Sequence, residues 1–266
     1  MSNSKLVSYK KLSPYNSGRR THKIDTVSIH CVVGQMSAVG LGYEFSKPFK
    51  NASSNYGIGY DGEIGCYVNE DSVSWCTSSQ KNDNRAVTIE VASDTFAPYK
   101  VTDKAYKSLI TLLADICIRN NIKELKWKAD KSLIGQVDKQ NMTVHRWFNP
   151  GKSCPGDYLY NLHGQIAKEV NERINCGFKI GKKVRFTKNK NIYKADCKTR
   201  VKYSSLNKNW KAKSHKGITG KAVFDKGETA ILKAVEHKNG KVFGVFGGKN
   251  YRILLVDKKG KKTGKQ

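Results

Sequence analysis

The hydrophobic pattern of the chain changes near Asn175, and this change limits the fold more than any other feature. Before that point, runs of β-branched residues alternate with two long segments whose apolar residues recur every three or four positions. After Lys179 only short β-type runs follow, separated by Gly, Asn and Lys. A chain of 266 residues can hold two domains that each bury a core. We therefore expect a mixed α/β domain over residues 1–175 and a small all-β, barrel-like domain over residues 178–266.

The positive charge of the chain belongs mainly to the second of these domains. Of the formal net charge of +27, residues 176–266 contribute +21, from 26 Lys or Arg and 5 Asp or Glu. A field of this sign attracts polyanions. Nucleic acid, an anionic lipid surface and the phosphate-rich polymers of Gram-positive walls all meet that requirement, and charge alone does not distinguish them. The partner of this domain is expected to be anionic.

The cysteines and the N-terminus indicate synthesis in a reducing compartment. Seven cysteines are an odd number without regular spacing, which does not suit a disulfide framework. The first residues, MSNSKLVSYKK, lack the apolar core of a secretory signal, and no stretch approaches the length of a membrane span. We expect folding in the cytosol, with no signal peptide and no membrane span.

Two predicted strands each contain an ionisable residue among apolar neighbours, which indicates a functional or structural role for that residue. Residues 25–31 (DTVSIHC) are rich in β-branched residues and place His30 near the end of the strand. Residues 86–92 (AVTIEVA) form another strand, in which Glu90 lies on the face opposite its apolar neighbours. Taken alone, His30 also fits a packed or surface histidine, and Glu90 an edge-strand charge that prevents aggregation.

The rest of the first domain is predicted to supply a hairpin and two amphipathic helices. Asp61 and Gly62 lie between short apolar runs, as in a tight turn between antiparallel strands. Thr102 can cap a helix that ends near Asn120, and a second helix begins near Asp157. We expect a central mixed sheet flanked by helices, with loops at one sheet edge holding the functional site.

The loop between the two helices carries the most distinctive chemistry. Its sequence, VHRWFNPGKSCPGDY, contains His145, Lys152 and Cys154 within ten residues. Together with His30, this loop offers two imidazoles and one thiolate, which suit Zn²⁺ and leave a fourth position open, as in catalytic zinc sites. Taken singly, Cys154 also fits a small buried hydrophobe and Lys152 a solvated surface residue.

These motifs together resemble the peptidoglycan amidases, a family that includes phage amidases, bacterial anhydro-muramyl peptide amidases and animal peptidoglycan recognition proteins. The resemblance covers roughly Lys23 to Ile174 and rests on the motifs TVSIH, SSNYGIGYDGEIG, AVTIEVAS and KSCPG. The last motif is the most specific, because a Lys two residues before the final ligand recurs with it in that family. The resemblance implies hydrolysis of the amide bond between N-acetylmuramic acid and L-alanine in bacterial peptidoglycan.

The resemblance also implies roles for individual residues. It makes His30, His145 and Cys154 the ligands of a Zn²⁺ cofactor, and Glu90 and Lys152 catalytic residues. Zinc would polarise the amide carbonyl and activate a water. Glu90 would carry the proton of that water to the leaving amine, and Lys152 would stabilise the charge of the tetrahedral intermediate.

The sequence departs from the family pattern at three positions. Cys31 follows the first ligand where many relatives have a polar residue, and Asn55 stands where His is frequent. Ser54 occupies the place of a Tyr that some members use beside the metal. We therefore assign no tyrosine to catalysis and expect Tyr56 to face the core.

The C-terminal domain resembles the cell-wall anchoring modules of Gram-positive phage lysins. Such a module would bind an anionic wall polymer and keep the catalytic domain close to its substrate. We expect most of its aromatic residues to form its core and its Lys-rich tail, residues 258–266, to be frayed. An endolysin, held in the cytoplasm of a bacterial host until a pore-forming protein releases it to the cell wall, would combine a wall substrate with the absence of a signal peptide.

Two other functions are compatible with parts of the sequence. A non-catalytic peptidoglycan-binding protein would have lost a zinc ligand or Glu90, and neither loss is seen. A nucleic-acid-binding protein would use the basic C-terminal third and bind duplexes with a steep salt dependence, but it leaves the KSCPG loop unexplained. Three tryptophans could line a substrate groove or pack in the core: Trp75, Trp127 and Trp147. The histidines without a partner pattern are interpreted as structural or surface residues: His22, His163, His215 and His237.

Overall fold

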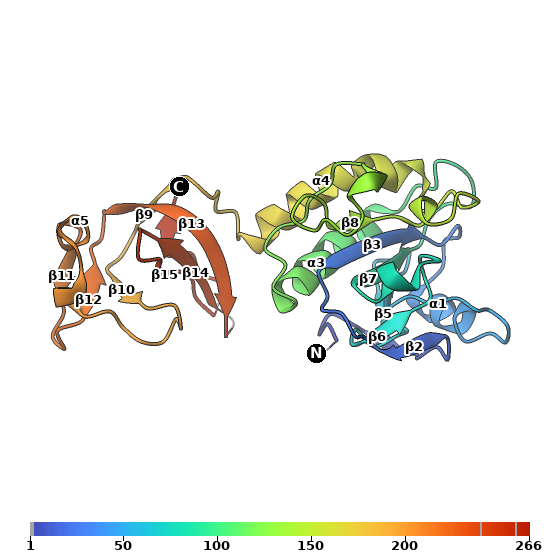
Figure 1. Cartoon of the computed structure of the whole chain (residues 1–266), viewed down its shortest axis with the longest axis horizontal. Coiled ribbons are helices and arrows are strands. Elements are labelled where there is room, and N and C mark those ends of the chain that lie inside the picture. The colour runs from blue at the N-terminus through green and yellow to red at the C-terminus, as the bar shows by residue number, and fades with distance from the viewer. Residues whose placement is uncertain (1–2, 240, 259) are drawn as a thin grey trace. The chain divides into compact units, whose positions relative to one another are not determined.

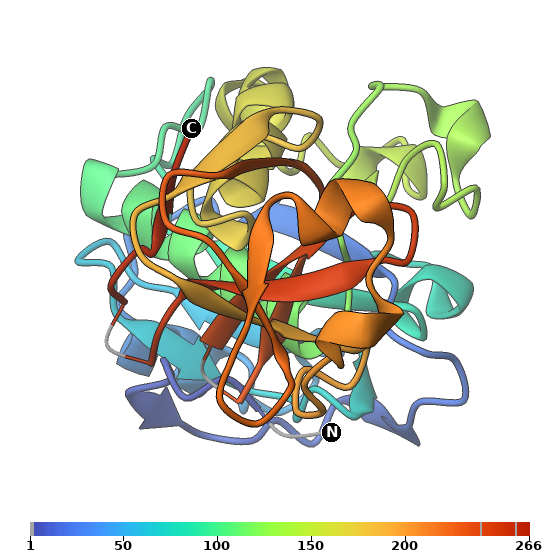
Figure 2. The same cartoon turned by 90° about the vertical axis from the view of Figure 1, so that its left-hand side faces the viewer.

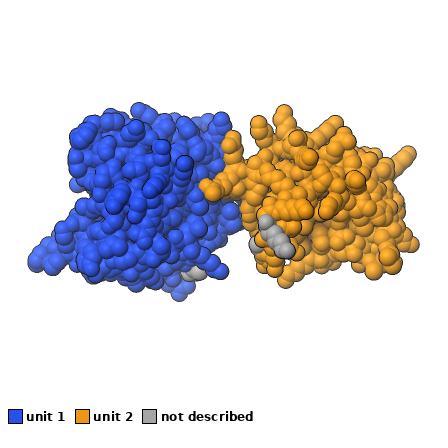
Figure 3. Space-filling model, turned by 180° about the vertical axis from the view of Figure 1, so that it is seen from behind, with its two compact units in different colours: residues 1–171 blue, residues 172–266 orange. Residues whose placement is uncertain are grey.

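The chain forms two compact units, Met1–Asn171 and Glu172–Gln266, coloured blue and orange in Figure 3. The structure is a computed structural model and describes residues 3–239, 241–258 and 260–266. The predicted order, a mixed α/β fold followed by an antiparallel β-sheet, is confirmed. Within these described ranges, no helix has both the length and the apolar character needed to cross a bilayer. All seven cysteines are free thiols in the structure.

A six-stranded mixed sheet, in the order β1-β5-β4-β7-β3-β8, is the centre of the first unit. Its strands are β1 (Tyr9–Lys10), β3 (Thr26–Cys31), β4 (Tyr56–Ile58), β5 (Ile64–Cys66), β7 (Ala86–Val91) and β8 (Met142–Thr143). The predicted hairpin is β4 and β5, the antiparallel pair, while all other neighbouring strands run parallel. A separate antiparallel ribbon pairs β2 (Asn16–Arg19) with β6 (Ser72–Ser74).

Two long helices, α3 (Asp103–Arg119) and α4 (Gly156–Ile174), are the amphipathic segments predicted from the sequence (Figure 1). The Thr102 side chain caps α3 by accepting a hydrogen bond from the backbone N–H of Ala105, at 3.1 Å. The two helices meet where Tyr106 Oη donates to Glu169 Oε1, at 3.1 Å. The shorter elements of this unit are α1 (Ala38–Glu44), α2 (Gln80–Asp83) and the 3₁₀ turns η1 (Lys131–Leu133) and η2 (His145–Trp147).

Helices α1 and α3 cover opposite faces of this sheet. Tyr56 Oη donates to Glu70, whose carboxylate pairs with Arg119 of α3. A Cβ atom added to the next residue, Gly57, would instead clash with Leu41 of α1. Because successive strand residues point to opposite faces, Tyr56 faces α3 and Gly57 faces α1. The prediction that Tyr56 faces the core is confirmed, since its side chain is fully buried.

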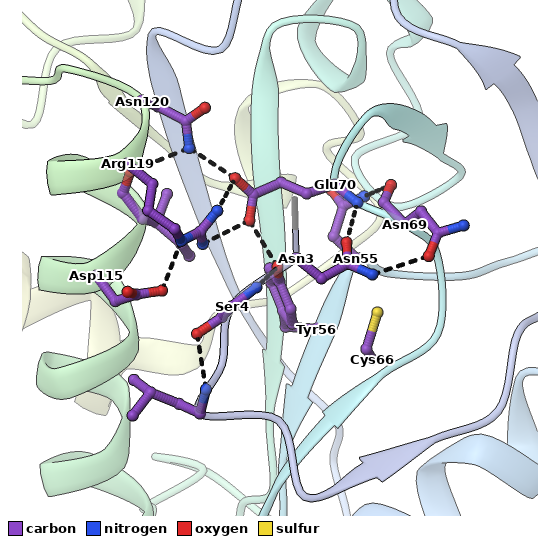
Figure 4. Close-up of polar contacts among 12 residues, drawn as sticks. Asn3, Ser4, Asn55, Tyr56, Cys66, Asn69, Glu70, Asp115, Arg119 and Asn120 are labelled. Atoms are coloured by element: carbon purple, nitrogen blue, oxygen red, sulfur yellow. Dashed lines mark hydrogen bonds and ion pairs between the residues drawn. The ribbon is translucent and has the colours of Figure 1, made fainter. Parts of the chain in front are cut away.

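The carboxylate of Glu70 links the N-terminal segment, β4 and α3 (Figure 4). Glu70 is fully buried and accepts two hydrogen bonds from Arg119, both at 2.7 Å. It also accepts from Asn120 Nδ2 and from Tyr56 Oη, each at 2.6 Å. The backbone N–H of Ser4 donates to Tyr56 Oη, at 2.9 Å. A buried charge is tolerated when it is paired and hydrogen-bonded in this way, so the network links β4 to α3.

The second unit is an antiparallel sheet in the order β11-β12-β10-β15-β14-β13-β9-β16, coloured orange to red in Figure 2. Its strands are β9 (Lys183–Phe186), β10 (Lys190–Tyr193), β11 (Ser214–Lys216), β12 (Ala222–Phe224), β13 (Thr229–Lys238), β14 (Lys241–Phe246), β15 (Tyr251–Val256) and β16 (Gly264–Lys265). The turns η3 (Tyr203–Ser205) and α5 (Lys208–Lys211) complete it. Aromatic rings fill its core as expected: the Phe186 ring lies 5.2 Å from that of Phe224 and 5.6 Å from that of Phe246.

The prediction that the Lys-rich tail is frayed is wrong for its last residues; residue 259 lies outside the described residues. β16 pairs with β9, and Thr263 is buried. Gln266 Nε2 donates to the backbone carbonyl of Lys179, at 2.7 Å. Backbone groups make most of these contacts, so the polar side chains of the tail contain no signal for them.

Candidate active site

The parallel pairing of β3 and β7 places His30 and Glu90 side by side. The two residues are register partners near the carboxyl ends of their strands. Their side chains approach to 4.0 Å, between His30 Nδ1 and Glu90 Oε1. Glu90 is also the register partner of Gly57, so both side chains lie on the α1 face of the sheet. Loops that follow parallel strands meet at this edge, which is a common position for sites in α/β folds.

The loop between β8 and α4 brings the other predicted ligands to His30. β8 pairs with β3, and His145 follows directly in η2. The ring centroids of His30 and His145 are 5.3 Å apart. Cys154 Sγ lies 3.3 Å from His30 Nδ1 and accepts a hydrogen bond from the backbone N–H of Cys31, at 3.4 Å. The possible ligand atoms of His30, His145 and Cys154 all lie within 4.8 Å of one another.

Two serines that the sequence analysis did not single out orient the imidazoles. Ser28 Oγ donates to the backbone carbonyl of Thr143, at 3.2 Å, and lies 3.0 Å from His30 Nε2. Because the only hydroxyl proton is used on that carbonyl, a neutral His30 donates from Nε2 and keeps the Nδ1 lone pair facing Cys154. Ser78 Oγ lies 2.9 Å from His145 Nε2, which leaves Nδ1 of His145 available in the same way.

The protonation of the two histidines suits metal binding. Burial, followed by the nearby His145, lowers the pKa of His30 well below its usual value. Burial and the positive charge of Lys152 lower the pKa of His145 to about 4. Both rings are therefore neutral at pH 7, the form that coordinates metals. Burial raises the pKa of Cys154, so its thiol must lose a proton when a cation binds.

One separation within this donor set is compatible with a tetrahedral ion such as Zn²⁺. With Zn–S near 2.3 Å and Zn–N near 2.05 Å, the S and N atoms of a tetrahedral site are about 3.5 Å apart. The 3.3 Å between Cys154 Sγ and His30 Nδ1 is close to that value. A second set, His30 with Cys76 and Glu90, also lies within 4.8 Å. We favour the first set because two imidazoles and one thiolate match known zinc sites better.

Glu90 faces the site with one carboxylate oxygen uncommitted. Its side chain is 17 % exposed, and its Oε1 atom lies 3.9 Å from Cys76 Sγ. Its Oε2 atom is buried and has no hydrogen-bond partner in the described part of the chain. Burial raises the pKa of Glu90 well above its usual value, and the nearby Cys31 adds to this effect. A carboxylate in this state is a stronger base than an exposed one.

A cavity of about 370 Å³ opens over these groups. Glu90, His145 and Cys154 line it, and the exposed Lys152 lies at the same wall. Helix α1 contributes Leu41 to the wall, and the flanking residues Met36 and Phe45 add further apolar side chains. The sequence analysis missed the other cation in the lining, Lys50, because nothing in its local sequence distinguishes it from the many other lysines of the chain.

The three tryptophans separate into two groups. The Trp127 and Trp147 rings are stacked, with centroids 4.9 Å apart and planes at 5°, and neither lines this cavity. Trp75 lines the cavity and is 40 % exposed. None of the four other histidines lines the cavity: His163 is fully buried, and the others are partly or fully exposed, namely His22, His215 and His237.

The chain is similar to several known proteins. A mutant endolysin from Bacillus subtilis is 16% identical, with a TM-score of 0.45 over 61% of this chain and 97% of that chain. An endolysin N-acetylmuramoyl-L-alanine amidase from Clostridium intestinale is also 16% identical, with a TM-score of 0.40 over 59% of this chain and 93% of that chain. A derivative of AmpD is 19% identical, with a TM-score of 0.46 over 63% of this chain and 99% of that chain. The search of curated proteins finds no match. Residues 20–157 match the family model described as N-acetylmuramoyl-L-alanine amidase. Because this match spans more than half of the chain, the protein belongs to the N-acetylmuramoyl-L-alanine amidase family.

Proposed function

We propose that this peptidoglycan amidase is an endolysin that uses Zn²⁺ held by His30, His145 and Cys154. The observation that carries the proposal is the convergence of these three side chains beside the uncommitted Oε2 atom of Glu90. The bond cut is the amide between the lactyl group of N-acetylmuramic acid and L-alanine.

Glu90 is the proton carrier in this proposal. Bound zinc supplies a Lewis acid that polarises the amide carbonyl and makes water a nucleophile at neutral pH. Glu90 accepts the proton of the attacking water and delivers it to the nitrogen of the leaving L-alanine. Its raised pKa serves both steps, because the carboxylate binds the proton firmly and can still release it to an amine.

Lys152 stabilises the negative charge that develops on the carbonyl oxygen during attack. Its charge reaches the site, since it is the second cause of the lowered pKa of His145. A preorganised cation at this position contributes to the rate because it favours the transition state over the bound amide. No observation favours the two alternatives, a non-catalytic peptidoglycan-binding protein or a nucleic-acid-binding protein.

The basic second unit is proposed to bind an anionic polymer of the cell wall. Its charge of +21 over residues 176–266 supports attraction to phosphate-rich polymers. Attachment would keep the catalytic unit at high local concentration around its substrate. We also propose a phage origin, with release from the host cytoplasm through a separate pore and lysis of the cell as the outcome.

Digestion of purified peptidoglycan tests the catalytic proposal. The released material is examined by mass spectrometry for stem peptides with free L-alanine amino termini, with and without a chelator. We expect such termini only without the chelator. If glycan and peptide stay joined under both conditions, the catalytic proposal is wrong; release that a chelator does not affect would remove the metal from it.

Deletion of residues 178–266 tests the division of labour between the two units. The shortened chain keeps α4 complete, including its buried residues Ile166, Val170 and Ile174. We expect a cooperative thermal transition and normal cleavage of a soluble muramoyl peptide, but at least a tenfold loss of sedimentation with intact walls. Sedimentation equal to that of the full chain would assign wall attachment to the first unit.

A further inference from the structure

A second, larger cavity adjoins the one over Glu90. It has a volume of about 560 Å³, against about 370 Å³ for the first. The two cavities share six lining residues: Lys50, Ala52, Trp75, Cys76, His145 and Lys152. Glu90 and Cys154 line only the smaller cavity. The reacting groups therefore lie in the smaller cavity and at its junction with the larger one, which extends the cleft beyond His145.

The side chains that line only the larger cavity are polar, and the two lysines in its wall, Lys50 and Lys152, are shared with the smaller cavity. Besides the shared residues, the larger cavity is lined by the hydroxyl and amide side chains of Ser17, Asn51, Ser74, Ser78, Ser79 and Gln80. Its single carboxylate, Asp83, is buried and already engaged by the backbone N–H groups of Cys76 and Thr77 and by Thr77 Oγ1. Such a lining offers hydrogen bonds to an uncharged ligand that carries hydroxyl and acetamido groups.

Trp75 forms a rigid aromatic wall between the two cavities. Its indole Nε1 donates to Ser17 Oγ, at 2.8 Å, and its ring packs against Tyr15, with centroids 5.8 Å apart. Its backbone N–H donates to Ser53 Oγ, at 3.0 Å, and its carbonyl accepts from the backbone N–H of Ser53, at 3.0 Å. The ring is nevertheless 40 % exposed. An exposed ring that is already held in place can bind the apolar face of a ligand with little further loss of entropy.

The smaller cavity has a different chemistry. Apolar side chains line it, including Met36, Leu41 and Phe45, together with the ion pair between Lys50 and Glu44, whose Nζ and Oε2 atoms are 3.2 Å apart. These apolar walls suit a peptide that carries aliphatic side chains. The two halves of the substrate on either side of the scissile amide, a sugar rich in polar groups and a peptide with aliphatic side chains, match the two halves of the cleft.

We infer that the larger cavity binds the glycan, with a pyranose ring packed on Trp75, and that the smaller cavity binds the stem peptide. This inference rests on the proposed function and adds which part of the substrate each cavity binds. Trp75 is then a specificity-determining residue, because it distinguishes a muramoyl peptide within a glycan from the same peptide without sugars.

Two substrates with the same peptide measure this discrimination. One carries the disaccharide of N-acetylglucosamine and N-acetylmuramic acid, and the other carries only the lactyl group in its place. We expect the zinc-loaded full chain to prefer the first, as a ratio of the two kcat/KM values. Trp75→Ala should lower this ratio about tenfold, and Trp75→Phe, which keeps an aromatic face, should restore most of it. Trp75→Ala should also weaken binding of the free disaccharide, measured by calorimetry in the presence of a chelator.

Met36→Ala is the matched control, since Met36 lines only the smaller cavity. It should change kcat/KM for both substrates by the same factor and leave their ratio intact. If Trp75→Ala does not fold, Gln80→Ala replaces it in the test. Gln80 is exposed and lines only the larger cavity, so its loss should lower the ratio about threefold. An unchanged ratio in folded variants of Trp75 or Gln80, or an equal change in Met36→Ala, overturns the inference. If the unmodified protein cleaves neither substrate, the proposed function fails instead.

Discussion

Replacing Cys154 with Ser should abolish amidase activity and weaken zinc binding by more than about 100-fold. The hydroxyl does not ionise near neutral pH, so the site loses its only anionic ligand among the three proposed residues. Mutation of residues that hydrogen-bond to metal ligands already lowers metal affinity about 10- to 100-fold, so the loss of a ligand itself should lower it further. His30→Ala and His145→Ala should behave in the same way. Zinc content after dialysis and the rate of amide cleavage measure both effects.

Cys76→Ser is the matched control for this change. Cys76 is a buried cysteine of the same cavity and belongs to the second possible ligand set, with His30 and Glu90. If our assignment holds, this variant keeps its zinc, whereas Cys154→Ser loses it. The opposite result would move the metal to the second set, and normal zinc content and turnover in all of the ligand variants would exclude both.

Glu90→Gln should retain zinc and lower kcat by about 10²- to 10⁴-fold, the usual contribution of a general acid–base residue. The amide keeps the size of the side chain but cannot accept the proton of the attacking water. Because Glu90 is not one of the proposed ligands, the zinc content should equal that of the unmodified protein. Single-turnover kinetics on a soluble muramoyl peptide measure the chemical step directly.

Glu44→Gln provides the comparison for this second prediction. Glu44 lines the same cavity, but its carboxylate forms surface ion pairs with Lys47 and Lys50. We expect kcat to fall by no more than about threefold, since such pairs contribute little. A near-normal rate for Glu90→Gln would remove Glu90 from the mechanism, and loss of its zinc would instead make Glu90 a ligand.

Local patterns predicted most of the regular elements. The strand of residues 25–31, the Asp61-Gly62 turn and the helix capped by Thr102 each carry a pattern in their own residues that predicts them, and all are present. The short β-type runs after Lys179 also contribute strands of the second unit. The tail was misjudged because β16 is held by backbone pairing with β9, about 80 residues away in the chain.

The sequence by itself determined the division into an α/β and a β region, the concentration of charge in the second, and the candidate residues at the ends of two strands and in the KSCPG loop. Only the tertiary structure decided how these residues meet. The parallel pairing of β3 with β7 and β8 brings His30 to Glu90 and to the loop of Cys154, although 124 residues separate His30 from Cys154. The approach of separate segments also forms the cleft lined by Lys50 and Trp75. A site of this kind is made by contacts between distant segments, and no local pattern of residues records them.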